Sequence, residues 1–376
     1  MKKQTVNRLA VFFLLVLTVA ALWPLQPARA ESPVVFMTNR DLAGMGVERP
    51  ELFWPIQLSR DGRTLLAAED LKGKATRSGA LSRLWLVEFN PDGSIKKSRN
   101  YPLVMPHRLQ NTMTPDEKGV VILARSGASF WHLDLQTGNL REFVHAGQGV
   151  SRFMAEPHVI WSYQGKMYVT GFPMNEKGVR GRQTVALLDP SKTDAAALTP
   201  TDLDIFEVYK HFDQPKNIRW VNPEMGFLGG LKGKAYHLVS WKKGIGYHQI
   251  ATLGKIESML GMGPFLAVAA VAADGASTAF LYDSATNRKW VAPPVPAASE
   301  YDYPFVSEGG ETLVLTEGRK GAATVNLLYG RPAGNYTLSP LPGLQNKKKG
   351  VIRLSADGSH LVLRNPDGLY YAEIPR

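Results

Sequence analysis

The stretch from Trp131 to Val144, WHLDLQTGNLREFV, limits the possible folds more than any other part of this sequence. It alternates apolar and polar residues, passes through a polar turn with a glycine at Gly138, and then alternates again, which is the pattern of a β-hairpin. Weaker copies recur along the chain. The steps between equivalent strand ends measure 42 to 55 residues, taking Glu88, Asp134, Asp189, Trp241, Asp283, Tyr329 and Glu373 as those ends.

Steps of this length are typical of the four-stranded blades of a β-propeller, which repeat every ~40–50 residues. Upstream of the hairpins, Ser-x-Asp-Gly turns at Ser59–Gly62 and Ser355–Gly358 each separate two short apolar strands, and Thr114–Gly119 is a longer version. The Ser and Asp side chains can accept hydrogen bonds from the turn backbone, and Gly takes a positive φ. Helical periodicity is almost absent, so the sequence predicts an all-β fold.

These Ser-x-Asp-Gly turns, together with the blade-length repeat, resemble the TolB-type, WD40-like propeller repeats of exported bacterial proteins. The resemblance covers nearly all of residues 31–376, but the segments between Val159 and Gly310 lack the turn motif. It implies a propeller and a scaffold role, and it carries no catalytic residues.

The ends of the chain predict how the ring closes. The last repeat, Gly350–Arg376, has room for three strands only, whereas the apolar segment Pro33–Thr38 has no partner of its own. Placed as the outer strand of the last blade, that segment would cover an exposed sheet edge. We therefore expect residues 31–376 to form one all-β domain, a seven-bladed β-propeller of four-stranded antiparallel blades closed by this N-terminal strand.

Residues 1–30 have the three parts of a secretory signal peptide: the cations Lys2, Lys3 and Arg8, the uncharged run Leu9–Trp23, and the cleavage pattern Ala28-Arg29-Ala30. We expect export to a periplasmic or extracellular location, with no membrane span after cleavage. The chain has no cysteine, so disulfides, thiolate metal sites and a cysteine nucleophile are excluded.

No recognisable catalytic motif occurs: the nucleophile elbow, the zinc-protease motif, the phosphate loop and the dinucleotide fingerprint are all missing. We therefore assign no catalytic residue and expect no cofactor. One alternative stays open, a hydrolase or lyase whose site in the central mouth is built from scattered residues, with or without a metal. Its candidates are His107, His211 and Asp302, with Arg108 beside them.

The net charge of +11 is expected to be unevenly distributed. In a four-stranded blade, the loops between the second and third strands share one end with the connections between blades. The cations expected at this end are Lys72, Lys74, Arg77, Arg108, Arg180, Arg182, Lys216 and Arg219. Such a field attracts anions. We predict a monomeric, non-enzymatic binding protein whose partner is an anionic envelope polymer or an acidic protein surface, and no nucleic acid.

The aromatic residues, Trp290 among them, are assigned to packing between blades. The alternative is that some of them stack against sugars at the rim. Trp220, Tyr301 and Tyr303 are the candidates for that role, because they lie near the expected starts of blades.

Overall fold

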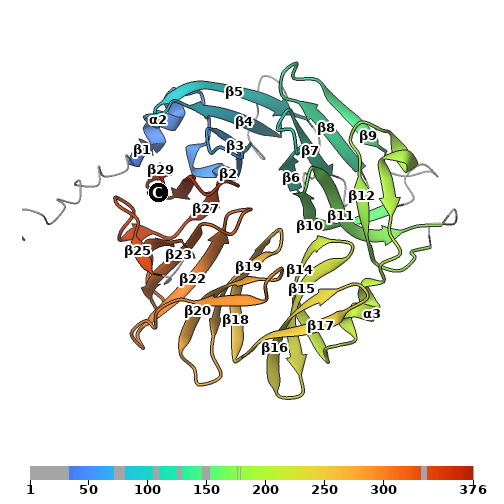
Figure 1. The fold of residues 1–376 in the computed structure, drawn as a ribbon. Coiled ribbons are helices and arrows are strands. Elements are labelled where there is room, and N and C mark those ends of the chain that lie inside the picture. Colours follow the sequence, from blue (N-terminus) through green and yellow to red (C-terminus); the bar gives the residue numbers. More distant parts are fainter. Residues whose placement is uncertain are drawn as a thin grey trace, which may run out of the picture. The chain divides into compact units, whose positions relative to one another are not determined.

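The computed structural model describes residues 34–71, 81–104, 110–124, 129–145, 153–175, 177, 179–331 and 337–375. These residues form seven antiparallel sheets, blades 1 to 7, which Figure 1 shows around a common centre. This arrangement confirms the predicted seven-bladed propeller of four-stranded blades. The predicted signal peptide, residues 1–30, lies outside the described residues.

The strands of each blade follow one another in sequence from the innermost outward, except for β1 in blade 7 and the short β26 in blade 6. Blade 1 consists of β2 (Phe53–Leu58), β3 (Thr64–Asp70), β4 (Ser82–Phe89) and β5 (Ile95–Leu103). Blade 2 consists of β6 (Gln110–Met113), β7 (Gly119–Ala124), β8 (Ser129–Asp134) and β9 (Leu140–Val144). Blade 3 consists of β10 (Phe153–Tyr163), β11 (Lys166–Pro173), β12 (Thr184–Leu188) and β13 (Leu198–Pro200).

Blade 4 consists of β14 (Gln214–Asn222), β15 (Met225–Lys232), β16 (Ala235–Lys242) and β17 (Gly246–Leu253). Blade 5 consists of β18 (Lys255–Met262), β19 (Phe265–Val271), β20 (Ser277–Asp283) and β21 (Arg288–Val291). Blade 6 consists of β22 (Ser299–Val306), β23 (Leu313–Arg319), β24 (Thr324–Gly330) and β25 (Leu338–Pro340), and the short β26 (Lys347–Lys348) also pairs with β24. Blade 7 consists of β27 (Val351–Leu354), β28 (His360–Asn365), β29 (Gly368–Glu373) and β1 (Val34–Thr38).

The antiparallel order gives each blade two ends. The turns joining its first strand to its second, and its third to its fourth, lie at what we call the turn end. The loops joining its second strand to its third, and the connections to the next blade, lie at the loop end. The predicted hairpin at Trp131–Val144 is confirmed as β8 and β9, with its turn at the turn end of blade 2.

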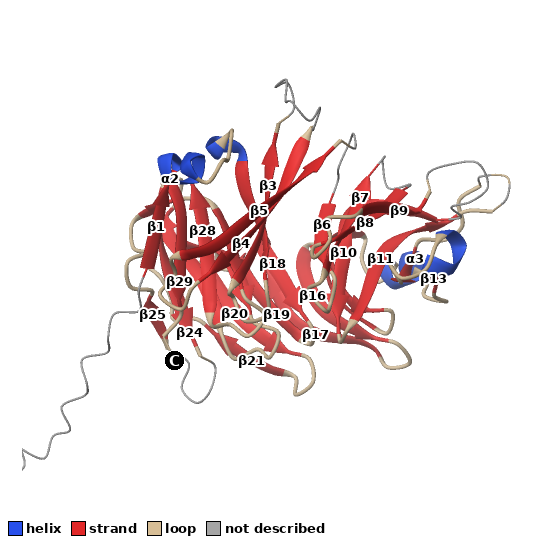
Figure 2. Cartoon of the chain, turned by 90° about the horizontal axis from the view of Figure 1, so that it is seen from above, coloured by secondary structure: helices blue, strands red, loops and turns tan. Residues whose placement is uncertain are grey.

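Short helices interrupt the strands among the described residues. They are α2 (Asn39–Gly44), α3 (Ile205–Tyr209) and the 3-10 turns Pro50–Leu52 and Asp194–Ala197, and Figure 2 shows α2 and α3 in blue. Each of the two α-helices has a capping side chain at its start, Thr38 for α2 and Asp204 for α3. At five or six residues, they are too short to produce a visible periodicity in the sequence. No helix in the described ranges is long and apolar enough to cross a bilayer.

Apolar side chains pack between the blades. Seven clusters of buried hydrophobic residues are present, and each joins two neighbouring blades. Phe130 and Phe143 of blade 2, for example, pack with Met167 and Leu188 of blade 3. This explains why the second strands read as nearly continuous apolar runs: both of their faces are buried.

The Ser-x-Asp-Gly turns have the predicted geometry. In blade 1, Ser59 Oγ accepts from the Thr64 amide at 2.8 Å, Asp61 Oδ1 accepts from the Arg63 amide at 2.9 Å, and Gly62 has a φ of +72°. The first turn of blade 6 uses the same device without the motif, because Ser307 Oγ accepts from the Thr312 amide at 3.0 Å. Sequence reasoning missed this copy, because Gly309 stands where the motif has Asp, while Ser307 and Gly310 keep the other two positions.

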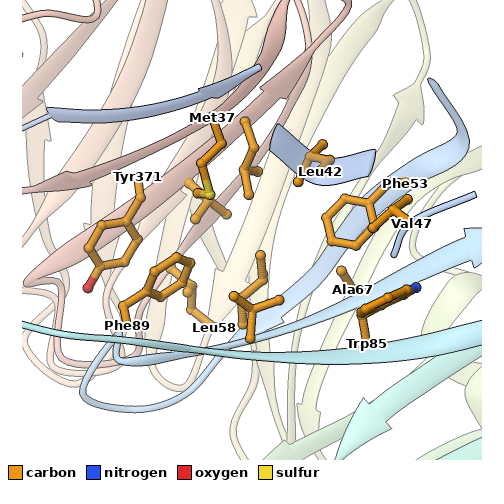
Figure 3. Packing of buried hydrophobic residues seen from close by; sticks show 13 residues of the cluster. Met37, Leu42, Val47, Phe53, Leu58, Ala67, Trp85, Phe89 and Tyr371 are labelled. Carbon is orange, nitrogen blue, oxygen red and sulfur yellow. The ribbon is translucent and has the colours of Figure 1, made fainter. Parts of the chain in front are cut away.

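Strand β1 closes the ring as predicted, pairing antiparallel with β29 from Val34 opposite Ala372 to Thr38 opposite Gly368. Figure 3 shows Met37 and Leu42 among side chains of blades 7 and 1. Met37 is 5% exposed and Leu42 is fully buried. Burying side chains of this kind contributes roughly 1.5–3 kcal/mol each, so the N-terminal segment is a stabilising part of the domain.

A buried arginine also connects the last blade to the first. Arg364 of β28 is 1% exposed, and its guanidinium donates to five oxygens. These are the carbonyls of Pro50, Phe53, Asn365 and Gly368 and the side-chain oxygen of Asn39. Burial lowers the pKa of Arg364. The residue therefore links blade 7 to α2 and to the start of blade 1.

Candidate functional site

At the turn end, the first turns of several blades contact one another. The Arg60 guanidinium of blade 1 pairs with the Glu308 carboxylate of blade 6 at 2.7 Å, and the Arg60 amide donates to Glu117 of blade 2 at 2.5 Å. The Glu308 amide donates to the Ala356 carbonyl of blade 7 at 2.8 Å. Burial is the main cause of the raised pKa of Glu117. The polar groups of these turns are thus largely engaged with each other.

Along the innermost strands, polar side chains join one blade to the next. Four of them bond to the neighbouring blade's backbone: Arg353 Nε to the Ile56 carbonyl (2.6 Å), Gln57 Oε1 to the Met113 amide (3.1 Å), Gln110 Nε2 to the Ile160 carbonyl (2.8 Å) and Trp161 Nε1 to the Val221 carbonyl (2.9 Å). These bonds run from blade 7 through blades 1, 2 and 3 to blade 4. Their side chains are therefore structural.

Asp302, a predicted mouth residue, lies on β22, the innermost strand of blade 6. Its Oδ1 accepts from the Tyr303 amide at 2.8 Å. Burial is the main cause of its raised pKa, Glu300 and Glu257 raise it further, and Lys349 opposes them. Asp302 is thus a half-buried carboxyl beside other carboxylates, the environment that makes an acid available for proton transfer.

His211, the second predicted mouth residue within the described ranges, has other neighbours. Its ring stacks on Tyr247 of β17, the outermost strand of blade 4, with centroids 4.1 Å apart. Burial lowers the pKa of His211. The structure does not bring His211 and Asp302 together, while His107 and Arg108 lie outside the described residues. Within the described ranges, no group of three or more His, Asp and Glu side chains is placed to hold a metal ion.

Of the eight cations predicted at the loop end, four lie within the described residues. Arg180 lies over the Phe172 ring at 5.6 Å, and Arg182 pairs with Asp204 at 2.8 Å. Lys216 is exposed at an irregularity of β14. Arg219 is exposed and donates to the Ile218 carbonyl at 3.0 Å. Lys72, Lys74 and Arg77 lie outside the described residues.

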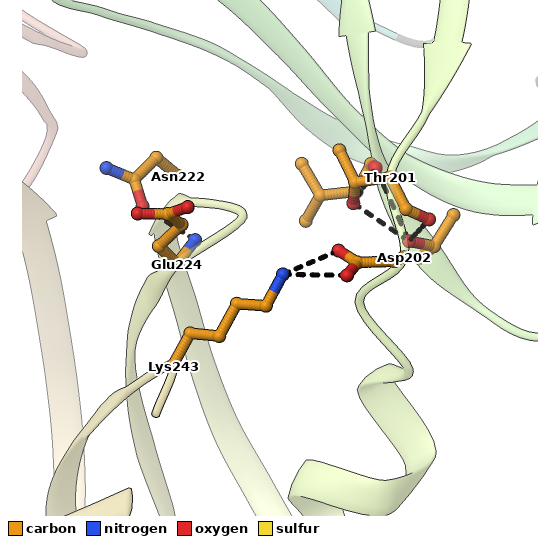
Figure 4. A network of polar contacts seen from close by, with 7 residues as sticks. Thr201, Asp202, Asn222, Glu224 and Lys243 are labelled. Carbon is orange, nitrogen blue, oxygen red and sulfur yellow. Dashed lines mark hydrogen bonds and ion pairs between the residues drawn. The ribbon is translucent and has the colours of Figure 1, made fainter. Parts of the chain in front are cut away.

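The connection from blade 3 to blade 4 carries its own ion pair. Lys243, in the third turn of blade 4, donates to both carboxylate oxygens of Asp202 at 2.7 and 2.8 Å (Figure 4). Figure 4 also shows Glu224, whose amide donates to Asn222 Oδ1 at 2.8 Å. Asp204 caps α3 and pairs with Arg182, so Asp202 and Asp204 of this connection are each paired with a cation.

A cleft of about 470 Å³ opens at the turn ends of blades 5 and 6. Phe265 and Trp290 of blade 5 contribute its apolar lining, and the first turn of blade 6 contributes Gly309, Gly310 and Glu311. Sequence reasoning assigned Trp290 to packing alone and named Trp220, Tyr301 and Tyr303 as the stacking candidates.

Two of those three candidates pack inside the protein. Tyr301 is 3% exposed and donates to the Pro293 carbonyl at 2.8 Å, while the half-buried Trp220 packs against the hydrophobic cluster between blades 3 and 4. Packing between blades is therefore the observed role of both. Tyr303 is 44% exposed.

Comparison with known proteins yields the fold. Neither a protein-family model nor a curated protein matches this chain. Among solved structures, an oligogalacturonate lyase in complex with manganese has a TM-score of 0.58 at 11% identity, over 92% of this chain and 97% of that chain. An oligogalacturonate lyase from Vibrio parahaemolyticus has a TM-score of 0.54 at 10% identity, over 86% and 89%.

TolB from Acinetobacter baumannii matches with a TM-score of 0.38 at 12% identity, over 86% of this chain and 64% of that chain. At such identities the two lyase matches show a shared propeller architecture alone, and function has to be argued from the site. The resemblance to TolB-type repeats stays a prediction.

Proposed function

We propose that this chain is an exported binding protein that holds an anionic partner at the loop end of its propeller. The observation that carries the proposal is the distribution of charge along the blades. The seven first turns, all at the turn end, contain seven acidic residues and three basic ones. Arg180 and Lys216, at the loop end, form no ion pair with a described residue. An acidic turn end repels an anion, so it directs the encounter toward the loop end.

The partner is an anionic envelope polymer or an acidic protein surface. Either one presents many spaced negative groups, which suits separate cations on several blades better than it suits one deep pocket. Arg180 is suited to such contacts, since its position over the Phe172 ring supports the guanidinium while leaving it exposed.

The test is retention on an immobilised sulfated polysaccharide such as heparin. Lys72, Lys74, Arg77, Arg180 and Lys216 are replaced together by Gln in one variant. The matched control removes an equal number of positive charges from the turn ends, by replacing Lys96, Lys97, Lys118, Lys166 and Lys192 with Gln. The loop-end variant is expected to elute at clearly lower salt than the control. Equal losses in the two variants would mean that net charge alone binds the matrix.

The alternative, a hydrolase or lyase, is favoured by one observation, the half-buried Asp302 with its raised pKa. Two of the structural neighbours are named as lyases, which is an analogy of fold. This alternative predicts that the protein depolymerises an acidic polysaccharide, detected as new chain ends, and that Asp302→Asn abolishes the reaction while binding to the polymer persists. A wild-type protein that binds such polymers without cleaving them would exclude it.

A further inference from the structure

The cleft between blades 5 and 6 has an aromatic floor. Phe265 begins β19 and Trp290 lies on β21, and both side chains are half-buried against the hydrophobic cluster between these blades. Part of each ring therefore packs on the core while part lines the cleft. Its volume of about 470 Å³ lies within the range of small-molecule sites, roughly 300–1,000 Å³.

Four charged side chains surround this floor, two of them held in place. Asp283 is 7% exposed, and its carboxylate accepts from the Ala285 amide at 2.8 Å and the Thr286 hydroxyl at 2.7 Å. Arg331 donates through Nε and Nη2 to the Pro375 carbonyl at 3.3 and 3.2 Å. These bonds fix both groups at the edge of the cleft before any ligand arrives.

The other two charged groups, Arg288 and Glu311, are exposed and contact no described residue through a hydrogen bond or ion pair. They come from different blades, Arg288 from β21 of blade 5 and Glu311 from the first turn of blade 6. The cleft thus offers free donors and a free acceptor on its two walls. The formal charges of the four groups cancel.

The shape of the cleft depends on the first turn of blade 6. A Cβ added to Gly310 would lie 2.3 Å from the Phe265 ring, and Gly310 has a φ of +72°. The turn therefore lies directly on that ring. At Gly309, a Cβ would meet only the Glu311 side chain, at 3.7 Å or more. The two glycines let the turn approach the floor and leave space above it.

We infer that this cleft binds a neutral saccharide, with one sugar ring against Trp290 and its hydroxyls bonded to Arg288 and Glu311. A pyranose has a face of C–H groups that suits an aromatic ring, and each of its hydroxyls both donates and accepts. A cleft with an indole, guanidinium donors and carboxylate acceptors satisfies both properties. Because the charges of the walls cancel, a neutral ligand suits the cleft better than an anion. The site is separate from the cationic loop-end residues.

The experiment measures binding of four neutral disaccharides, maltose, cellobiose, lactose and N,N′-diacetylchitobiose, by calorimetry and by the change in tryptophan fluorescence. At least one is expected to bind the wild-type protein. Trp290→Ala should weaken that binding about tenfold or more, the loss that ~1.4 kcal/mol produces. Arg288→Gln and Glu311→Gln should each weaken it too, and being surface changes they should leave the unfolding temperature unaltered. Tyr303→Ala, which removes an exposed aromatic ring on β22, is the control and should bind as the wild type does.

Three results would overturn the inference: no binding of any of these sugars, unchanged affinity in both Arg288→Gln and Glu311→Gln, or tighter binding of an acidic disaccharide such as digalacturonate. The loop-end variant with five cations replaced by Gln should bind the neutral sugar normally. Failure of this proposal and failure of the loop-end proposal are therefore distinguishable.

Discussion

Replacing Arg364 by Lys tests how the ring is held closed. The Arg364 guanidinium donates to five oxygens at the junction of blade 7, blade 1 and α2. A lysine ammonium has three donors and no planar fork, so at least two of these buried oxygens lose their partner. Leaving a buried acceptor unsatisfied costs ~1–3 kcal/mol, so Arg364→Lys should lower the free energy of unfolding by roughly 2–6 kcal/mol.

The assay is equilibrium urea unfolding followed by tryptophan fluorescence, with Arg40→Lys as the matched control. Arg40 is exposed on α2, in the same part of the molecule, and its replacement should change stability by no more than about 0.5 kcal/mol. An Arg364→Lys protein with the wild-type urea midpoint would refute the reasoning. It would mean that β1 pairing and apolar burial alone close the ring.

Two further predictions concern single positions. Gly62→Ala should be more destabilising than Gly233→Ala. Both glycines have a positive φ, +72° and +62°, but a Cβ on residue 62 would lie 2.5 Å from His360 Cβ, whereas a Cβ on residue 233 would meet nothing within 4 Å. Equal urea midpoints for the two variants would contradict this prediction. The pKa of His145 is raised above its ordinary value of 6.5, mainly by the hydrogen bond to Asp194 at 2.7 Å. A raised folded-state pKa stabilises the fold below the unfolded pKa and ceases to do so as the pH rises through the folded pKa. A proton NMR titration should therefore show the His145 pKa falling toward 6.5 in Asp194→Asn, and an unchanged value would exclude the pair.

The features that could be predicted from the sequence are those set by local chemistry. The turn at Ser59–Gly62 and the hairpin at Trp131–Val144 were predicted because their backbone conformations depend on nearby side chains. The closing strand was predicted from an edge that needed a partner. The short α2 was not, since six residues give no helical period.

The site features that could not be predicted depend on contacts between distant segments. Nothing local marks Arg364 as buried, and its acceptors include Pro50 and Phe53, more than 300 residues away. The cleft joins Trp290 to Glu311 across two blades, a juxtaposition that exists only after the blades have packed. His211 was predicted at the mouth because it precedes an innermost strand, and its stacking on Tyr247 of an outermost strand could not be foreseen from the sequence.

The pairing of β1 with β29 has a consequence for the order of events during folding. The two strands are separated by more than 300 residues, so the contact that completes the ring has almost the greatest sequence separation available to this chain. Bringing such distant segments together is slow, because the entropy cost of closing a long loop is offset by strand pairing only after the intervening sheets have formed. Until then, the apolar flank of the first sheet that Met37 and Leu42 later cover remains open to water. That interval is when a nascent or refolding chain is most exposed to aggregation.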